Sequence, residues 1–142
     1  MTQGGHPLDP IKPPPRSYEG RETILLVDDD QSVRALARAV LSRYGYAVLD
    51  ASDADAAIQV ADQHPSSIDL LLTDVNMPGL GGHALEEHLK QARPTLKTLF
   101  MSGDPTNTLV RRGPVVEMPP FVPKPFTPEM LVRAVRAVLD SP

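Results

Sequence analysis

Four apolar stretches of the sequence are each followed by polar residues that could take part in chemistry. These residues are the acidic run Asp28-Asp29-Asp30, the carboxylate of Asp74, the hydroxyl of Ser102 and the ammonium of Lys124. Adjacent carboxylates repel one another, and a fold tolerates them more readily where a cation or a helix N-terminus absorbs the charge. Mg²⁺ (or Mn²⁺) suits such a place because it prefers oxygen ligands, binds one or two carboxylates and leaves room for phosphate.

Taken alone, each of these residues has a simpler structural explanation. Asp30 can cap the helix that follows it, and Asp28 and Asp29 suit a solvated loop as well as a metal site. The other three are ordinary as a turn residue, a Ser-Gly turn and a surface charge, in the order Asp74, Ser102 and Lys124. Chance placement of polar groups at the ends of four predicted strands is improbable, so we interpret them together.

The elements that must position these groups follow from the hydrophobic period. Short apolar runs predict strands at residues 23–28, 46–51, 68–73, 98–102 and 115–122. Between them, apolar residues recur at helical spacing, first as the stripe Val33, Leu36, Ala37, Val40 and Leu41. Further helices are predicted over 54–61 and 82–92, and a last one begins after the cap residue Thr127, with Leu131, Val135, Val138 and Leu139 facing inward.

Alternating strands and helices at these spacings predict a doubly wound α/β domain with a parallel sheet and helices on both faces. In such a sheet the functional site lies at the carboxyl ends of the strands. Because all the strands run the same way, the acidic run, Asp74, Ser102 and Lys124 are expected to meet at one edge.

Composition excludes several classes of protein. The 142-residue chain has no cysteine, so a disulfide framework, a thiolate metal site and a cysteine nucleophile are excluded. Its net charge is −4, which argues against direct binding of nucleic acid. No apolar run has the length of a signal peptide or a membrane span, and we expect a cytoplasmic protein.

Residues 1–21 differ from the rest of the chain. Five of the 16 prolines precede residue 16, a composition that does not build a packed core. We interpret residues 1–21 as a disordered tail or linker and residues 22–142 as the folded domain. A docking motif for a proline-binding partner is the alternative for the tail.

Four sequence blocks, in this order and spacing, resemble the receiver domain of two-component response regulators. The blocks are Ile24-Leu25-Leu26-Val27-Asp28-Asp29-Asp30, Leu72-Thr73-Asp74-Val75-Asn76-Met77-Pro78-Gly79, Phe100-Met101-Ser102-Gly103 and Lys124-Pro125-Phe126. The resemblance covers Glu22 to Asp140. It implies a flavodoxin-like fold of five strands in the order 2-1-3-4-5 and a cis peptide between Lys124 and Pro125.

The resemblance also implies roles for individual residues. Asp74 is the expected phosphoacceptor, and the Mg²⁺ ligands are Asp29, Asp74 and the Asn76 carbonyl, with Asp28 acting through water. Lys124 is expected to pair with Asp74 and later with the phosphoryl group, to which Ser102 donates a hydrogen bond. Phe121 stands at the position of the switch aromatic, although an ordinary core role explains it equally well. Asn76 and Asp104 are expected to influence dephosphorylation.

The sequence departs from the usual receiver pattern between Asp104 and Pro120. That stretch leaves room for two turns of helix at most, so we expect a short or irregular fourth helix. A pseudo-receiver that binds partners without phosphorylation remains the main alternative function. A flavin or nucleotide carrier is disfavoured by the acidic run, and a haloacid-dehalogenase-like phosphohydrolase by Asn76. The four histidines are expected at the surface, with His64 ending a helix.

The implied partners are a histidine kinase or a phosphotransfer protein, together with an unidentified downstream protein. Such a domain catalyses its own phosphorylation and dephosphorylation but is a signalling protein and not a turnover enzyme. No output domain follows Leu139 in the sequence. We therefore expect either a stand-alone receiver or the receiver end of a hybrid histidine kinase.

Overall fold

The computed structural model describes residues 18–103 and 121–142, which form a single five-stranded sheet with helices on both faces. The strands are β1 (Thr23–Val27), β2 (Ala47–Ala51), β3 (Leu70–Asp74), β4 (Lys97–Ser102) and β5 (Phe121–Pro123). They lie in the order β2-β1-β3-β4-β5, and every neighbouring pair is parallel. The predicted doubly wound, flavodoxin-like fold is confirmed.

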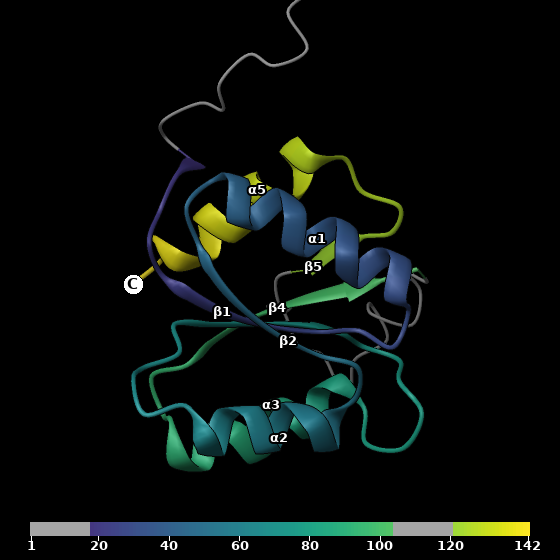
Figure 1. The fold of residues 1–142 in the computed structure, drawn as a ribbon, viewed down its shortest axis with the longest axis vertical. Helices are drawn as coiled ribbons and strands as arrows, with labels where there is room; N and C mark the ends of the chain where they lie inside the picture. Colours follow the sequence, from purple (N-terminus) through teal and green to yellow (C-terminus); the bar gives the residue numbers. More distant parts are fainter. Residues whose placement is uncertain (1–17, 104–120) are drawn as a thin grey trace, which may run out of the picture.

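The described helices cover the two faces of the sheet in pairs. They are α1 (Gln31–Arg43), α2 (Ala54–Gln63), α3 (Gly82–Ala92) and α5 (Pro128–Leu139). Figure 1 shows α1 and α5 on one face and α2 and α3 on the other. Within the described ranges, no helix combines the length and the apolar character needed to cross a membrane.

The central strands are buried on both faces, as the crossover helices require. All five residues of β3 are buried, and so are the last four of β1. Successive side chains alternate between the two faces. Ile24 and Leu26 therefore belong to the core beneath α1 and α5, and Leu25 and Val27 to the core above α2 and α3.

Side-chain caps fix where α1 and α5 begin. The Asp30 side chain accepts hydrogen bonds from the Ser32 and Val33 amides, so its predicted capping role is confirmed. The Thr127 hydroxyl likewise accepts from the Met130 amide, and Pro128 occupies the first helical position. These two caps start α1 and α5 directly after the loops that carry Asp28 and Lys124.

Some predicted details differ from the structure. Leu36 was expected on the buried stripe of α1 but is 46% exposed, because the buried face is centred on Ala37, Val40 and Leu41. Tyr46 is buried but precedes β2, and Leu139 is only half-buried. The predicted strand at 115–122 is observed only from Phe121, since residues 115–120 lie outside the described ranges. The predicted short fourth helix and Asp104 also lie outside them.

The part of the predicted tail that the structure describes, residues 18–21, contacts the domain. The Tyr46 hydroxyl donates a hydrogen bond to the Tyr18 carbonyl at 2.8 Å, and the Gly20 amide donates to the Tyr44 carbonyl at 3.1 Å. Tyr18 also packs against the core on the α1 and α5 side. The packed chain therefore extends to at least Tyr18, several residues before the boundary that proline content suggested.

Candidate functional site

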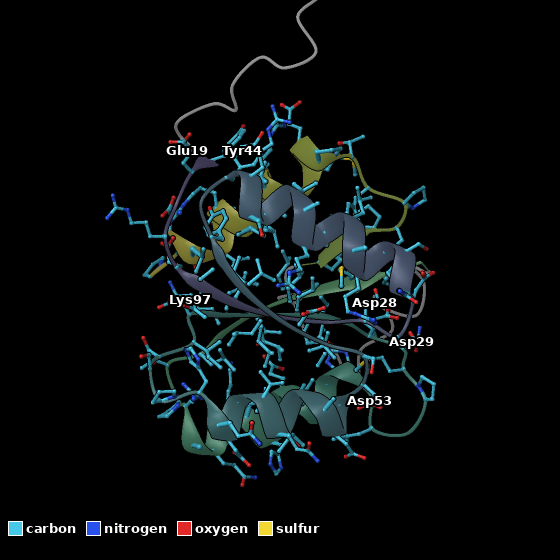
Figure 2. All side chains as sticks on the ribbon, viewed as in Figure 1. Glu19, Asp28, Asp29, Tyr44, Asp53 and Lys97 are labelled. Carbon is cyan, nitrogen blue, oxygen red and sulfur yellow. The ribbon has the colours of Figure 1, made fainter. Side chains whose placement is uncertain are left out.

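The acidic run lies where β1 passes into α1. Asp28 is fully buried, whereas Asp29 is exposed and Asp30 caps the helix. Figure 2 shows Asp28 and Asp29 at one end of the sheet and Lys97 near the other. The three adjacent carboxylates therefore occupy different environments, and only Asp30 is accounted for by helix capping.

Asp28 is held at several of its polar atoms. Its amide donates to the Ala51 carbonyl at 3.2 Å, and its Oδ1 accepts a hydrogen bond from the Asp30 amide at 2.9 Å. Its Oδ2 lies 2.8 Å from Lys124 Nζ and, apart from that ion pair, accepts no hydrogen bond from the described residues. These contacts fix the carboxylate of Asp28 toward the interior.

Asp74 is the last residue of β3 and is almost fully buried, with 6% of its surface exposed. Its Oδ1 accepts a hydrogen bond from the Asn76 amide at 3.4 Å. The start of α3 packs closely beneath it, since a Cβ at Gly82 would collide with the Asp74 carbonyl. A glycine at position 82 thus lets the helix approach the strand that presents Asp74. The predicted turn after Asp74 is also observed, with Gly79 at a φ of 78°.

Lys124 joins the two buried carboxylates. Its Nζ lies 3.3 Å from Asp74 Oδ2 and 2.8 Å from Asp28 Oδ2. The sequence indicated proximity to Asp74 but not the closer contact with Asp28. The Lys124 amide donates to the Ser102 carbonyl at 2.8 Å, which places the loop after β5 against the end of β4. The peptide between Lys124 and Pro125 is cis, as the resemblance implied.

The site is electrostatically unbalanced. Burial raises the pKa of Asp74 above its ordinary value, Lys124 opposes that shift, and the charge of Asp28 reinforces it. Burial by itself would lower the pKa of Lys124, but the hydrogen bond and charge of Asp28, followed by the charge of Asp74, raise it overall. The ammonium therefore stays charged, and a carboxylate with too little compensation lies beside it.

The donor set fits a hard divalent cation. Asp28, Asp29 and Asp74 each offer a carboxylate oxygen, and these three oxygens all lie within 4.8 Å of one another. One ammonium against three carboxylates leaves an excess of two negative charges. Mg²⁺ and Mn²⁺ prefer such closely spaced oxygen ligands. A bound cation would relieve the repulsion that the burial of Asp28 and Asp74 creates.

The remaining predicted residues lie around this cluster to different extents. Ser102 ends β4 and is fully buried, and its register partner is Pro123 of β5. Asn76 follows β3 and is exposed. Phe121 begins β5 and is half-buried. The structure therefore brings together four strand ends at one edge, as the parallel topology predicts.

The histidines that the structure describes lie on α3 and at the end of α2. His83 and His88 are exposed on α3, as expected, and the His83 ring contacts Phe100 at 4.4 Å between centroids. His64 caps the end of α2, but it is half-buried and its Nε2 is buried without a partner among the described residues. The surface prediction is therefore wrong for His64.

Arg34 is a residue at this edge that sequence reasoning missed. Its Nη1 donates to the Asp28 carbonyl at 2.6 Å. The only sequence signal is its place early in the predicted helix after the acidic run, where a side chain can reach back to that loop.

A family model described as the response regulator receiver domain matches residues 24–136. The match covers β1 from its second residue, all of β2 to β5, and α5 as far as Arg136.

Individual relatives agree with this model. The chain is 31% identical over 122 residues to a protein named sensor kinase CckA from Brucella abortus, covering 86% of this chain and 13% of that protein. It is 35% identical over 108 residues to the two-component response regulator ARR14 of Arabidopsis thaliana, covering 76% of this chain and 28% of that protein. The chain thus spans only a small part of each.

A solved structure is matched over nearly its whole length. The receiver domain of a hybrid histidine kinase CckA superposes with a TM-score of 0.69 at 33% identity, covering 83% of this chain and 99% of that structure.

Proposed function

The chain belongs to the receiver-domain family of two-component response regulators, and from that premise we propose that Asp74 is the phosphoacceptor of a two-component phosphorelay. The observation that carries the proposal is the position of Asp74. Its buried carboxylate lies 3.3 Å from the Lys124 ammonium and within a cluster of three carboxylates. This arrangement offers a nucleophile, a fixed positive charge and a place for a divalent cation at one edge of the sheet.

The proposed reaction is the transfer of a phosphoryl group from a phosphohistidine to Asp74. A carboxylate oxygen of Asp74 attacks phosphorus and forms a P–O bond while the P–N bond of the phosphohistidine breaks. The imidazole leaves with the electron pair of that bond and is protonated. Asp74 needs no general base, because it is already a carboxylate when it attacks. Burial keeps water away from Asp74, which favours attack on phosphorus by the carboxylate over attack by water.

Mg²⁺ bound by Asp29, Asp74 and the Asn76 carbonyl, with Asp28 acting through water, would supply positive charge for the phosphoryl oxygens. Lys124 holds a second positive charge beside Asp74, and its ion pair with Asp28 keeps the ammonium directed at the site. Phosphoryl transfer depends mainly on such positioning and charge neutralisation. Lys124 is therefore expected to move from Asp74 to a phosphoryl oxygen after transfer.

Ser102 and Phe121 are the proposed route from the site to the surface. The Ser102 hydroxyl is expected to donate to a phosphoryl oxygen, because Ser102 ends the strand next to β3. The added group brings a charge of about −1.5 to −2 and three acceptor oxygens, which is enough to pull the Ser102 loop inward. Phe121 is the candidate side chain for the space that this movement vacates. Asn76 and Asp104 are proposed to tune how fast water removes the phosphoryl group.

The proposed phosphoryl donor is a histidine kinase or a phosphotransfer protein, and the output is contact with a downstream protein. The similarity to a protein named sensor kinase and to a hybrid-kinase receiver supports the hybrid-kinase origin over a stand-alone receiver. A cytoplasmic location follows from such partners.

The test is intact-mass analysis after incubation with acetyl phosphate and Mg²⁺. We expect one added phosphoryl group on the wild-type protein and none on Asp74→Ala. EDTA should stop the reaction. Asp62→Ala, an exposed carboxylate of α2, is the matched control and should be modified like the wild type. An unmodified wild-type mass would instead favour the pseudo-receiver alternative.

A further inference from the structure

Arg34 links the acidic loop to the neighbouring helix and strand. It lies in the first turns of α1, and its side chain is only 18% exposed. Its Nη1 donates a hydrogen bond to the main-chain carbonyl of Asp28 at 2.6 Å. A charged donor makes this a strong contact, and its acceptor belongs to the loop that carries the carboxylates.

The other side of the Arg34 guanidinium is anchored on β2. Its Nε lies 3.4 Å from Oδ2 of Asp50, whose Oδ1 accepts a hydrogen bond from Arg38 Nη1 at 2.8 Å. Asp50 is the register partner of Leu26, two residues before Asp28. Arg34 therefore spans α1, the loop and the edge strand, whereas Arg38 contacts the same carboxylate without reaching the loop.

A fixed Asp28 carbonyl sets the orientation of the peptide unit that precedes Asp29. That carbonyl and the Asp29 amide share one planar peptide unit, so fixing the first sets the orientation of the second. The Asp29 carboxylate takes no hydrogen bond or ion pair from any residue of 18–103 and 121–142. Among the described residues no side chain holds the Asp29 carboxylate directly, so its direction depends on the main chain of the loop. Arg34 holds that main chain at the Asp28 carbonyl, alongside the hydrogen bond from the Asp30 amide to Asp28 Oδ1.

We propose that Arg34 is a positioning residue that aims the Asp29 carboxylate at the cation site, with Asp50 as its anchor. The inference rests on the proposed function and concerns its metal-binding step. Because Arg34 reaches a carbonyl and not a reacting atom, its loss should weaken cation binding and leave the transfer step itself intact.

The sign of the effect separates positioning from simple charge. A positive charge near three carboxylates disfavours a second cation, so removing Arg34 would tighten cation binding if charge alone mattered. Removing a group that orients a ligand weakens metal binding instead, typically by about 10- to 100-fold in metalloproteins. The two explanations therefore predict opposite changes.

The experiment is a Mn²⁺ titration of the wild type, Arg34→Ala, Arg34→Lys and Asp50→Asn, with free Mn²⁺ followed by electron paramagnetic resonance. Arg38→Ala is the matched control, because it removes a guanidinium from the same carboxylate without touching the loop. We expect Arg34→Ala to raise the Kd for Mn²⁺ about tenfold. Arg34→Lys keeps the charge but not the guanidinium that contacts Asp28 and Asp50 at once, so its Kd should fall between those of Arg34→Ala and the wild type. Arg38→Ala should stay within about twofold of the wild type.

Phosphorylation by acetyl phosphate gives a second measurement. The rate for Arg34→Ala should be low at limiting Mg²⁺ and return to the wild-type rate at saturating Mg²⁺. Equal Kd values for Arg34→Ala and Arg38→Ala, or tighter binding by Arg34→Ala, would overturn the inference. If Arg34→Ala does not fold by circular dichroism, Arg34→Lys and Asp50→Asn decide on the same criterion. A wild type that binds Mn²⁺ in an Arg34-dependent way but is not phosphorylated would refute the proposed function and leave the inference standing.

Discussion

Two clusters of charged side chains lie at opposite ends of the sheet, and they use similar residues with opposite results. At the carboxyl ends of the strands, Lys124 contacts Asp28 and Asp74. At the amino ends, Arg136 of α5 pairs with Glu22 at 2.7 Å and with Asp140 at 2.8 Å. Figure 1 shows the C-terminus, which follows Asp140, on the side away from the start of α1.

The two clusters differ in how well their carboxylates are compensated. Hydrogen bonds from Arg136 lower the pKa of Glu22 and that of Asp140. Arg136 also donates to the Tyr46 hydroxyl and the Glu19 carbonyl, so each nitrogen of its guanidinium donates at least one hydrogen bond. Burial instead raises the pKa of Asp74. A charge cluster that satisfies its members stabilises the fold, whereas one that leaves a buried carboxylate poorly compensated marks a place for a ligand.

The largest expected effect separates chemistry from stability. Lys124→Gln should slow phosphorylation by acetyl phosphate about 100-fold, because one preorganised positive group beside the phosphoryl oxygens is lost. Arg136→Gln, the corresponding change at the other cluster, should leave this rate within about twofold. Equal losses in both variants, measured by the rate of mass increase, would abolish the distinction between the clusters.

The Arg136→Gln variant, which should keep its phosphorylation rate, should instead lose stability. The free energy of unfolding in urea is expected to fall by about 2 kcal/mol, because the hydrogen bonds of Arg136 with Glu22, Asp140 and Tyr46 are lost. Arg133→Gln is the control, since Arg133 is 63% exposed and pairs with an equally exposed Glu129. Its loss should leave the free energy of unfolding close to that of the wild type, because water screens an ion pair this exposed.

Asp74→Asn should stabilise the metal-free protein by about 1 kcal/mol at neutral pH, as active-site replacements can. The carboxylate that it removes is desolvated and repelled by Asp28. Urea unfolding in EDTA measures the change, and Asp62→Asn on the exposed face of α2 should leave stability unchanged within about 0.5 kcal/mol. A destabilised Asp74→Asn would show that the ion pair with Lys124 outweighs the burial of the carboxylate.

The smallest expected effect is a pH dependence at the amino-end cluster. Because Arg136 lowers the pKa of Glu22, the stabilisation from this ion pair is fully present above the ordinary pKa of a glutamate. It is lost as the pH falls through the lowered value. The stability difference between the wild type and Glu22→Gln should therefore be about 0.5 kcal/mol at pH 7 and vanish at acidic pH. A difference that grows as the pH falls would contradict this assignment.

The sequence predicted which residues lie at the carboxyl ends of the strands better than it predicted the contacts that hold them there. Asp74, Ser102 and Lys124 were predictable because each follows an apolar run and the parallel topology brings strand ends together. The contact of Lys124 with Asp28 was not predictable, since it depends on which of two neighbouring carboxylates points inward. The anchoring of Arg34 by Asp50 depends on the register of β1 with β2, which the local pattern does not specify.

The same limit applies to the fold. The family resemblance predicted the strand order, and periodicity predicted the helices. The helical stripe wrongly included Leu36, because an exposed residue at the margin of the buried face still fits a helical period. Proline content placed residues 18–21 in the tail. Their attachment comes from hydrogen bonds with Tyr44, Tyr46 and Arg136, which are distant in sequence.

The short strand β5 at the edge of the sheet limits how other chains can add to it. The Lys124 amide points inward to Ser102, so by strand alternation the nitrogen of Pro123 faces outward, and it has no hydrogen to donate. An incoming strand would find only the Phe121 amide as a donor along this three-residue edge. Strand addition at β5 is thereby discouraged, which makes fibrous aggregation through this strand less favourable.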